Sequence, residues 1–260
     1  MNTNKHQRHW IAFSTLLTRE VRRFLRIWPQ TLLPPAITMT LYFIIFGNLI
    51  GSRIGEMGGF SYMDYIVPGI IMMAVINNAY ANVASSFYSA KFQSHIEELI
   101  VAPIPNYLIL AGYVAGGTAR GLCVGLIVTI VSLFFTQLPI QHLLITISMV
   151  FLSAILFALG GFINAIYAQS FDEIAIIPTF ILTPLTYLGG VFYSINLLPD
   201  FWQNVSLLNP ILYMVNAFRF GMLGASDIPV FIAFSIIIVC IIALSTFAIS
   251  LLNKGTGLRN

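Results

Sequence analysis

Residues Tyr65–Tyr88 read YIVPGIIMMAVINNAYANVASSFY, a run without a charged side chain. A helix that crosses a bilayer needs about 20 consecutive, mainly apolar residues, so this run is long enough to span a membrane. Asn78, Asn82 and Ser86 are spaced to share one face of that helix. Polar side chains inside a span face protein or water rather than lipid. They therefore either hydrogen-bond to other helices, which we favour, or line a transport pathway.

The composition of the whole chain also indicates that lipid surrounds most of it. Of its 260 residues, 58% are hydrophobic and 8% are charged, whereas soluble domains contain about 25% charged residues. The sequence therefore predicts an all-α membrane protein with a single transmembrane domain over residues 1–260. Apolar runs predict six transmembrane helices: 32–50, 65–88, 106–135, 142–165, 174–192 and 229–252.

The residues before the first span form an amphipathic pattern. Between residues 8 and 28, aromatic and aliphatic side chains recur at helical spacing, and arginines fall on the opposite face. A basic face opposite an aromatic face is typical of a helix that lies in the headgroup region, so we expect an interfacial helix over 8–28. The apolar stripe consists of Trp10, Phe13, Leu17, Val21, Phe24 and Trp28, and the basic face of Arg19, Arg22, Arg23 and Arg26.

A short polar stretch, Ser94–Pro105 (SHIEELIVAPIP), separates the second and third spans. Ser94 and Glu97 have the spacing of a capping box at a helix start, and the two prolines end the helix. Glu97 and Glu98 lie off the apolar face of this helix. It is either an ordinary surface helix or a lever that a partner protein moves. Its apolar face would carry Phe92, Ile96, Leu99 and Ile100.

The third span carries a stripe of small residues and one charge. Gly117, Gly121 and Gly125 recur every four residues, which allows helices to approach closely. Arg120 lies inside the apolar run. It either reaches the headgroups, or it needs a carboxylate or carbonyl partner and is then a functional candidate; we favour a structural role. Asp172 and Glu173 lie in the short connection between the fourth and fifth spans.

The distribution of lysine and arginine predicts the orientation. Cytoplasmic loops carry an excess of these residues. Arg53 and Arg219 fall on one side of the six-span topology, so the other side, with both termini and Ser94–Pro105, is predicted to be cytoplasmic. That side carries Lys5, Arg8, Arg19, Arg22, Arg23, Arg26, Lys91, Lys254 and Arg259.

Sequence motifs for catalysis are absent. The chain has no glycine-rich loop with a lysine for ATP, no HExxH, no paired cysteines at metal spacing and no GxSxG. We therefore expect neither an enzyme, a bound cofactor nor a metal site. The net charge of +3 is no sign of nucleic-acid binding. The lack of acidic residues in the middle of the predicted spans argues against a proton-driven secondary transporter.

The stretch Gly189–Arg219 reads GGVFYSINLLPDFWQNVSLLNPILYMVNAFR. Its Gly-Gly and aromatic end of the fifth span, Leu198-Pro199, Trp202, Asn209-Pro210 with Tyr213, and Arg219 resemble the C-terminal signature of ABC-2 type permeases. The interfacial helix, the six spans and the cytoplasmic helix after the second span fit that family over essentially the whole chain. It looks closest to the small bacterial permeases of the drug-resistance and nodulation-export kind.

The resemblance implies the fold and the partners. The segment between the fifth and sixth spans would be a re-entrant helical pair that dips in from outside. Two copies would pair in the lipid bilayer of the bacterial cytoplasmic (inner) membrane, and each would dock a separate ATP-binding subunit. ATP and magnesium would bind in that partner subunit.

It also implies roles for particular residues. Movement of the cytoplasmic helix would couple ATP hydrolysis to export of an amphipathic, drug-like or lipid-like compound. A polysaccharide or glycolipid is the alternative substrate, and an ion-coupled secondary transporter is the alternative of another class. The expected coupling residues are Glu97, Glu98, Leu99 and Ile100, with Asp172 and Glu173 as secondary contacts. The expected pathway residues are Asn78, Asn82, Ser86, Tyr193, Trp202 and Tyr213, although the three aromatic residues also suit a membrane-interface belt.

Overall fold

The computed structural model describes residues 5–257. Within that range the chain is almost entirely helical, with one two-stranded β-hairpin. The helices run α1 (Lys5–Arg26), α2 (Trp28–Thr31), α3 (Leu33–Tyr42), α4 (Gly51–Ile54), α5 (Tyr62–Phe92), α6 (His95–Val101), α7 (Asn106–Ser132), α8 (Leu143–Tyr167), α9 (Phe171–Ile177), α10 (Thr183–Leu188), α11 (Asp200–Leu207), α12 (Pro210–Leu223) and α13 (Val230–Lys254). Wider helical turns cover Phe43–Ile50 and Pro178–Leu182, a 3₁₀ turn covers Ile195–Leu197, and the hairpin pairs β1 (Glu56–Met57) with β2 (Phe60–Ser61).

Six helical segments of the described chain are long and apolar enough to cross a membrane, as predicted. The fifth contains the wider turns at Pro178, where proline removes a backbone donor. The third stops at Ser132, earlier than the predicted 135, because Leu133–Phe135 form a turn. The segments are Trp28–Ile54, Tyr62–Phe92, Asn106–Ser132, Leu143–Tyr167, Phe171–Leu188 and Val230–Lys254.

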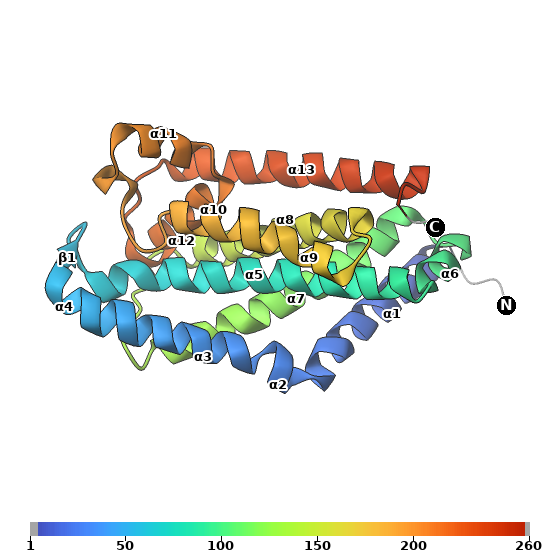
Figure 1. Cartoon of the computed structure of the whole chain (residues 1–260), viewed down its shortest axis with the longest axis horizontal. Coiled ribbons are helices and arrows are strands. Elements are labelled where there is room, and N and C mark those ends of the chain that lie inside the picture. The colour runs from blue at the N-terminus through green and yellow to red at the C-terminus, as the bar shows by residue number, and fades with distance from the viewer. Residues whose placement is uncertain (1–4, 258–260) are drawn as a thin grey trace.

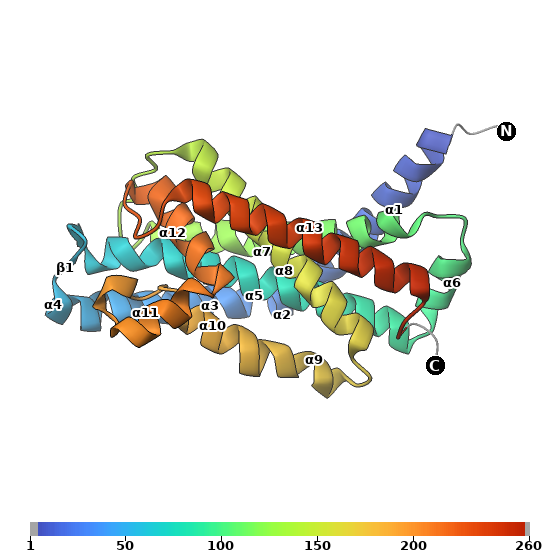
Figure 2. The same cartoon turned by 90° about the horizontal axis from the view of Figure 1, so that it is seen from above.

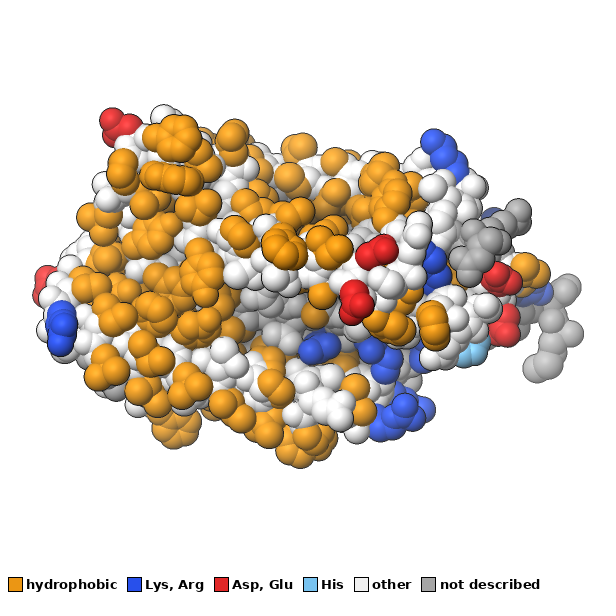
Figure 3. Space-filling view, in the orientation of Figure 1, with side chains coloured by type: hydrophobic (Ala, Val, Ile, Leu, Met, Phe, Trp, Pro, Cys, Tyr) orange, Lys and Arg blue, Asp and Glu red, His pale blue; other side chains and the backbone are white. Residues whose placement is uncertain are grey.

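The segments run lengthwise beside one another (Figures 1 and 2). The start of α1, α6 and the end of α13 lie at one end of the molecule, and the hairpin lies at the other. Hydrophobic side chains cover the middle of the face shown in Figure 3, whereas charged side chains gather toward the end with α1 and α6. A lipid-facing surface has this distribution, because hydrocarbon tails cannot solvate charges.

Helix α5 is the centre of the bundle. It packs against α7, α8 and α12, and 89% of its membrane window is buried, against at most 44% for the other five segments. A helix covered by protein on all sides can carry polar groups that lipid would exclude. The stretch Tyr65–Tyr88 is thus the core helix, a position that its length and polarity alone do not specify.

The predicted glycine stripe on α7 is confirmed as a close-packing surface, and it faces α5. A β-carbon on Gly121 would lie 2.9 Å from the Ala79 β-carbon and 3.0 Å from the Val75 carbonyl oxygen. Gly117 meets Val83 and the Ala79 backbone, and Gly125 meets Val75. Any side chain at these positions would push the two backbones apart, so glycine sets their separation.

Helix α1 is amphipathic, but its faces differ from the predicted ones. Leu16, Glu20 and Phe24 are the buried positions and form one stripe. Leu16 contacts α7 at Gly112, and Glu20 contacts it at Gly116. Glu20, an acidic residue, therefore faces the protein. The sequence had suggested an apolar stripe directly opposite a basic face, with no acidic residue between them.

The segment after the fifth span forms the short helix pair α11 and α12. Asn209 caps α12, because its side chain accepts a hydrogen bond from Ile211 N (3.0 Å) and donates one to Leu185 O (2.5 Å). Most of α12 is buried, against α5, α8 and α13. The break at Asn209-Pro210, quoted above for the family resemblance, is thus where the chain turns back into the bundle.

Two adjacent glycines on α8 provide a test of this packing. A methyl group on Gly161 would overlap the Tyr80 carbonyl oxygen of α5, whereas one on Gly160 would lie 3.6 Å from ring carbons of Tyr80, an ordinary contact. We expect Gly161→Ala to lower the free energy of unfolding by about 1–3 kcal/mol relative to Gly160→Ala, the usual cost of overpacking. Denaturant titration of the detergent-purified proteins measures this difference. Equal stability of the two variants would contradict the close α5–α8 approach.

Candidate functional site

The predicted coupling residues lie at the end of the molecule that holds α6 and the start of α9. Glu97 and Glu98 are exposed on α6, whereas Ile96 is 2% exposed and packs into the apolar cluster of α5, α7 and α8. Leu99 packs on the edge of the same cluster. The side chain of Ile100 lies outside the described part of the structure. The apolar face of α6 thus turns inward and its carboxylates turn outward.

The predicted capping box at Ser94 is wrong. Ser94 adopts a left-handed conformation, with φ of 60°, and its side chain makes no cap hydrogen bond. Backbone contacts replace it: Ser94 N–H donates to Lys91 O (3.0 Å), and Glu97 N–H donates to Ser94 O (3.2 Å). The chain has to turn sharply between α5 and α6, and a capping serine with extended backbone could not make that turn.

A capping arrangement occurs instead at the start of α9. Ser170 Oγ accepts a hydrogen bond from Glu173 N (3.2 Å), and Glu173 Oε2 accepts one from Gln169 N (2.8 Å). The Ser-x-x-Glu spacing at 170–173 is visible in the sequence, and we overlooked it. Glu173 therefore has a structural role at the helix start, whereas Asp172 beside it is exposed.

The end of α5 joins the two acidic segments. The Phe171 ring of α9 lies edge-on to Tyr88, with centroids 4.8 Å apart, and 5.5 Å from Phe92. Lys91 Nζ donates to the Ile166 and Ala168 carbonyl oxygens, at 2.7 and 2.8 Å. A lysine on the last carbonyls of α8 also suits the negative end of that helix. The end of α5, which leads into α6, is therefore bound to both α8 and α9.

The polar stripe of α5 is buried, and each of its three side chains makes a hydrogen bond, whereas Asn82 Nδ2 has no partner among the described residues. Asn78, Asn82 and Ser86 are 7%, 0% and 5% exposed. Arg23 Nη2 donates to Asn82 Oδ1 (2.8 Å), and Ser86 Oγ donates to Glu20 Oε2 (2.5 Å). These are the contacts between helices that we favoured from the sequence. Of the three, Ser86 also lines a pocket, which is described below.

Glu20 is a central residue that sequence reasoning missed. Its side chain is 1% exposed, and its carboxylate lies 3.2 Å from Arg19 Nη2 and 3.5 Å from Arg23 Nε. Arg19 also donates to Tyr113 Oη (2.7 Å). Although burial alone lowers it, the pKa of Arg19 is raised above its ordinary value by Tyr113 and Glu20. A glutamate within a basic run reads as surface charge, so no local signal revealed its burial.

Arg120 has carbonyl partners, one of the two arrangements expected from the sequence. Its Nη2 donates to Thr31 O (3.3 Å) and to Asn78 Oδ1 (3.2 Å). It thereby links the first span to α5 and α7. Carbonyl partners are the arrangement for which the sequence kept a functional role open, and Arg120 Nε is buried without a partner among the described residues.

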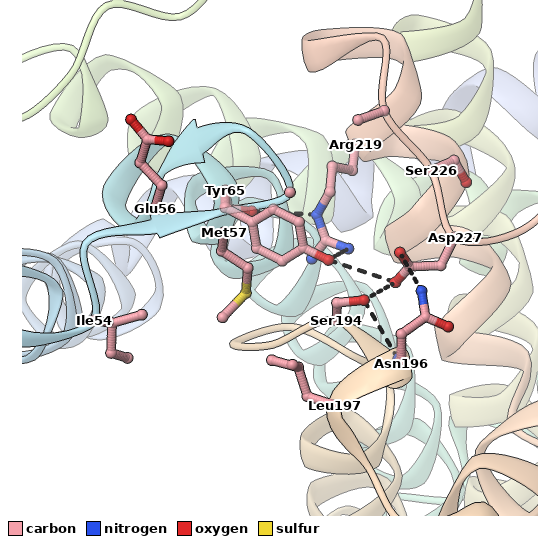
Figure 4. A pocket seen from close by; sticks show the side chains of 12 residues that line it. Ile54, Glu56, Met57, Tyr65, Ser194, Asn196, Leu197, Arg219, Ser226 and Asp227 are labelled. Atoms are coloured by element: carbon pink, nitrogen blue, oxygen red, sulfur yellow. Dashed lines mark hydrogen bonds between the residues drawn. The ribbon is translucent and has the colours of Figure 1, made fainter.

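A pocket of about 530 Å³ lies at the opposite end of the bundle, beside the hairpin (Figure 4). Asp227 stands in its wall and accepts hydrogen bonds from Ser194 Oγ (3.0 Å) and Asn196 Nδ2 (3.4 Å). Tyr65 Oη donates to the same carboxylate over 3.5 Å. Tyr65 on α5, Ser194 after the fifth span and Asp227 before the sixth thus meet at one point.

Arg219, on α12, lies behind this pocket and is 1% exposed. Its guanidinium carbon is 3.9 Å from the centroid of the Tyr65 ring, and Nη1 donates to Tyr65 Oη (3.1 Å). Nε donates to Tyr65 O (3.2 Å), and Nη2 donates to Gly190 O (2.6 Å). Arg219 therefore fixes three segments together and leaves no guanidinium nitrogen without a partner.

The aromatic pathway candidates lie near this end, and none of them lines this pocket. Tyr193 Oη donates to Tyr187 O (2.9 Å), and Tyr213 Oη donates to Leu207 O (2.7 Å). Trp202 is 45% exposed on α11. Within residues 5–257 no three histidine, cysteine, aspartate or glutamate side chains are grouped as metal ligands would be.

Comparison with known proteins places the chain in a family. The family model described as "ABC-2 type transporter" matches residues 11–223. The chain is 58% identical over 252 residues to the inner membrane transport permease YadH of Escherichia coli K12, covering 97% of this chain and 98% of that protein. It is also 22% identical over 185 residues to nodulation protein J of Rhizobium leguminosarum bv. viciae, covering 71% of each.

Two tyrosines on the first turn of α5 test the role of the cluster around Arg219. Tyr65→Phe removes a hydroxyl that bonds two charged groups, and should cost about 1.5–3 kcal/mol of unfolding free energy. Tyr62, similarly buried, donates to the neutral Phe192 carbonyl (3.1 Å), so Tyr62→Phe should cost about 0.5–1.5 kcal/mol. Denaturant titration ranks the two. A smaller loss for Tyr65→Phe would show that the cluster does not hold this end together.

Proposed function

Since the chain belongs to the ABC-2 type transporter family and is an integral-membrane transport permease, we propose that it serves an ATP-driven exporter in the bacterial inner membrane. A separate ATP-binding subunit binds ATP and magnesium and hydrolyses the nucleotide. This chain contributes the transmembrane path. The observation that carries the proposal is the exposed acidic face of α6, anchored to the central helix of the bundle.

The geometry suits a mechanical link. Ile96 inserts into the core cluster while Glu97 and Glu98 stay outside. A partner that pulls or presses on α6 therefore acts on α5 through Ile96, and on α8 and α9 through Lys91 and Phe171. Because α5 contacts most of the other spans, its displacement would repack the bundle rather than one loop.

The inward turn of the apolar face favours the outward, acidic face of α6 as the docking surface. Ile96 is already occupied by contacts within the chain, so the carboxylates and the 85%-exposed Val101 form the free surface. Exposed acids favour a basic groove on the ATP-binding subunit. Asp172 lies at the same end and adds a second acidic contact, whereas Glu173 holds the start of α9.

The proposed assembly contains four subunits of two kinds. Two copies of this chain pair within the bilayer, and each binds one ATP-binding subunit. Family membership supports this arrangement.

The charge distribution supports an orientation with both termini in the cytoplasm. Lys91 and Lys254, at the ends of α5 and α13, and the basic residues of α1 all belong to the end that holds α6. Arg53 lies at the other end, beside the hairpin. An excess of positive residues marks the cytoplasmic side. The amphipathic α1 then lies at the inner membrane surface, and α11 and α12 dip into the bundle from outside.

The transported compound is amphipathic, either drug-like or lipid-like. Tyr193, Trp202 and Tyr213 near the outer end would contact it on exit, and these rings suit sugars equally well, so a polysaccharide or glycolipid is the second candidate. ATP-driven uptake of a labelled lipid or glycan into inside-out vesicles, whose cytoplasmic face points outward, separates the two. An ion-coupled secondary transporter would instead show flux that follows an ion gradient without ATP.

Reversal of the acidic face tests the coupling. We expect Glu97→Lys/Glu98→Lys to reduce substrate-stimulated ATP hydrolysis in the assembled complex by roughly tenfold, because like charges across an interface cost several kcal/mol. The assay uses the chain co-purified with the ATP-binding subunit encoded beside it. Asp200→Lys, which reverses an exposed charge at the other end of the molecule, is the control and should leave hydrolysis unchanged. Full stimulation in the double variant would count against coupling through α6.

A further inference from the structure

A second pocket, of about 870 Å³, lies between α1 and the last turns of α5. Its walls are polar and strongly basic. Arg19, Arg22, Arg23 and Arg26 line it from α1, against one carboxylate, Glu20. Hydroxyl and amide donors complete the lining, including Ser14, Thr15, Thr18, Ser86, Ser89 and Gln93.

The four arginines are not equivalent. Arg19 and Arg23 are held by Glu20, Tyr113 and Asn82, as described above. Arg22 and Arg26 are exposed, and neither has a hydrogen bond or ion pair with any residue in the described range 5–257. One carboxylate faces four guanidinium groups, and two of these groups keep all their donors free for a ligand.

The chemistry of the free donors indicates the ligand. Guanidinium groups bind phosphate through paired N–H donors, and they do so more specifically than lysine does. Arginines at positions 19, 22, 23 and 26 share one face of a helix, so several can reach the same group. The hydroxyl donor of Thr18, one helical turn before Arg22, suits the remaining phosphate oxygens.

The exposed apolar side chains on and next to α1 indicate the source of that phosphate. Trp10 and Trp28, near the two ends of α1, are 68% and 55% exposed, and Leu25 and Ile27 are 46% and 37% exposed. Exposed indoles and aliphatic side chains that alternate with arginines are typical of a helix at the headgroup level. Such side chains favour a position of the pocket close to the lipid phosphates.

We propose that this pocket binds the phosphate of an anionic lipid in the leaflet that surrounds α1. Arg22 and Arg26 are the primary ligands, and Glu20 holds Arg23, which reaches α5, and Arg19, which reaches α7, as the inner wall. Binding there ties the position of α1 to the headgroup charge of the membrane. The site requires neither ATP nor transport, so it can be tested whether or not the exporter assignment holds.

The test uses the full chain in phosphatidylcholine nanodiscs that contain spin-labelled phosphatidylglycerol. Electron spin resonance gives the motionally restricted fraction, and hence the preference for phosphatidylglycerol over spin-labelled phosphatidylcholine. We expect Arg22→Gln/Arg26→Gln to lower that preference by roughly fivefold or more, because the variant loses the charge-assisted N–H donors that would hold the phosphate in the pocket. Arg22→Lys/Arg26→Lys should recover part of it, because charge returns without the paired donors.

Lys5→Gln/Lys254→Gln is the matched control. It removes the same charge from exposed residues at the same end of the molecule but outside the pocket, and should keep the wild-type preference. An arm with 10 mM inorganic phosphate identifies the source of the phosphate. Displacement of the labelled lipid would show that the pocket also accepts free phosphate, and no displacement would show that it requires the lipid. Equal preference in wild type and Arg22→Gln/Arg26→Gln, or no preference in wild type, would overturn the proposal.

Discussion

The burial of polar side chains on α5 is the constraint on which this structure depends. Within a bilayer an unpaired amide or hydroxyl has no water to bind, so each one needs a protein partner. Asn78 accepts a hydrogen bond from Arg120, Asn82 accepts one from Arg23, and Ser86 donates one to Glu20. These bonds draw the first span, α1 and α7 around α5. The helix with the most polar face is therefore the one that the others enclose.

Both ends of α5 are closed by charged groups, and the two ends differ in their freedom. At the end beside the hairpin, Arg219 and Asp227 meet through Tyr65, and Arg219 has a partner for each guanidinium nitrogen. At the end that holds α6, Glu20 is likewise buried between arginines, but it stands next to exposed basic and acidic side chains. The charged groups at the first end are thus fully paired, whereas the second end keeps exposed charges, which are the ones used in the two proposals above.

Most of the helical framework could be predicted from the sequence, because bilayer thickness sets the length of each apolar run and glycine spacing marks close contacts. The six spans and the Gly117–Gly125 stripe were predicted in this way. What could not be predicted arises from contacts between distant residues. Tyr65 and Asp227 are 162 positions apart, and Glu20 resembles a surface residue until α5 and α7 cover it. The helix cap predicted at Ser94 is absent, and a cap of the same kind occurs at Ser170. Local spacing does not reveal where the chain must turn.

That turn has a consequence for how force passes through the protein. Ser94 holds a left-handed backbone, φ 60°, which costs a residue with a β-carbon about 1–2 kcal/mol and which glycine would adopt freely. A serine there stores this strain at the junction between α5 and α6. A pull on α6 that let Ser94 return to an ordinary backbone conformation would release the strain, so the junction would oppose such a movement less than one built with glycine.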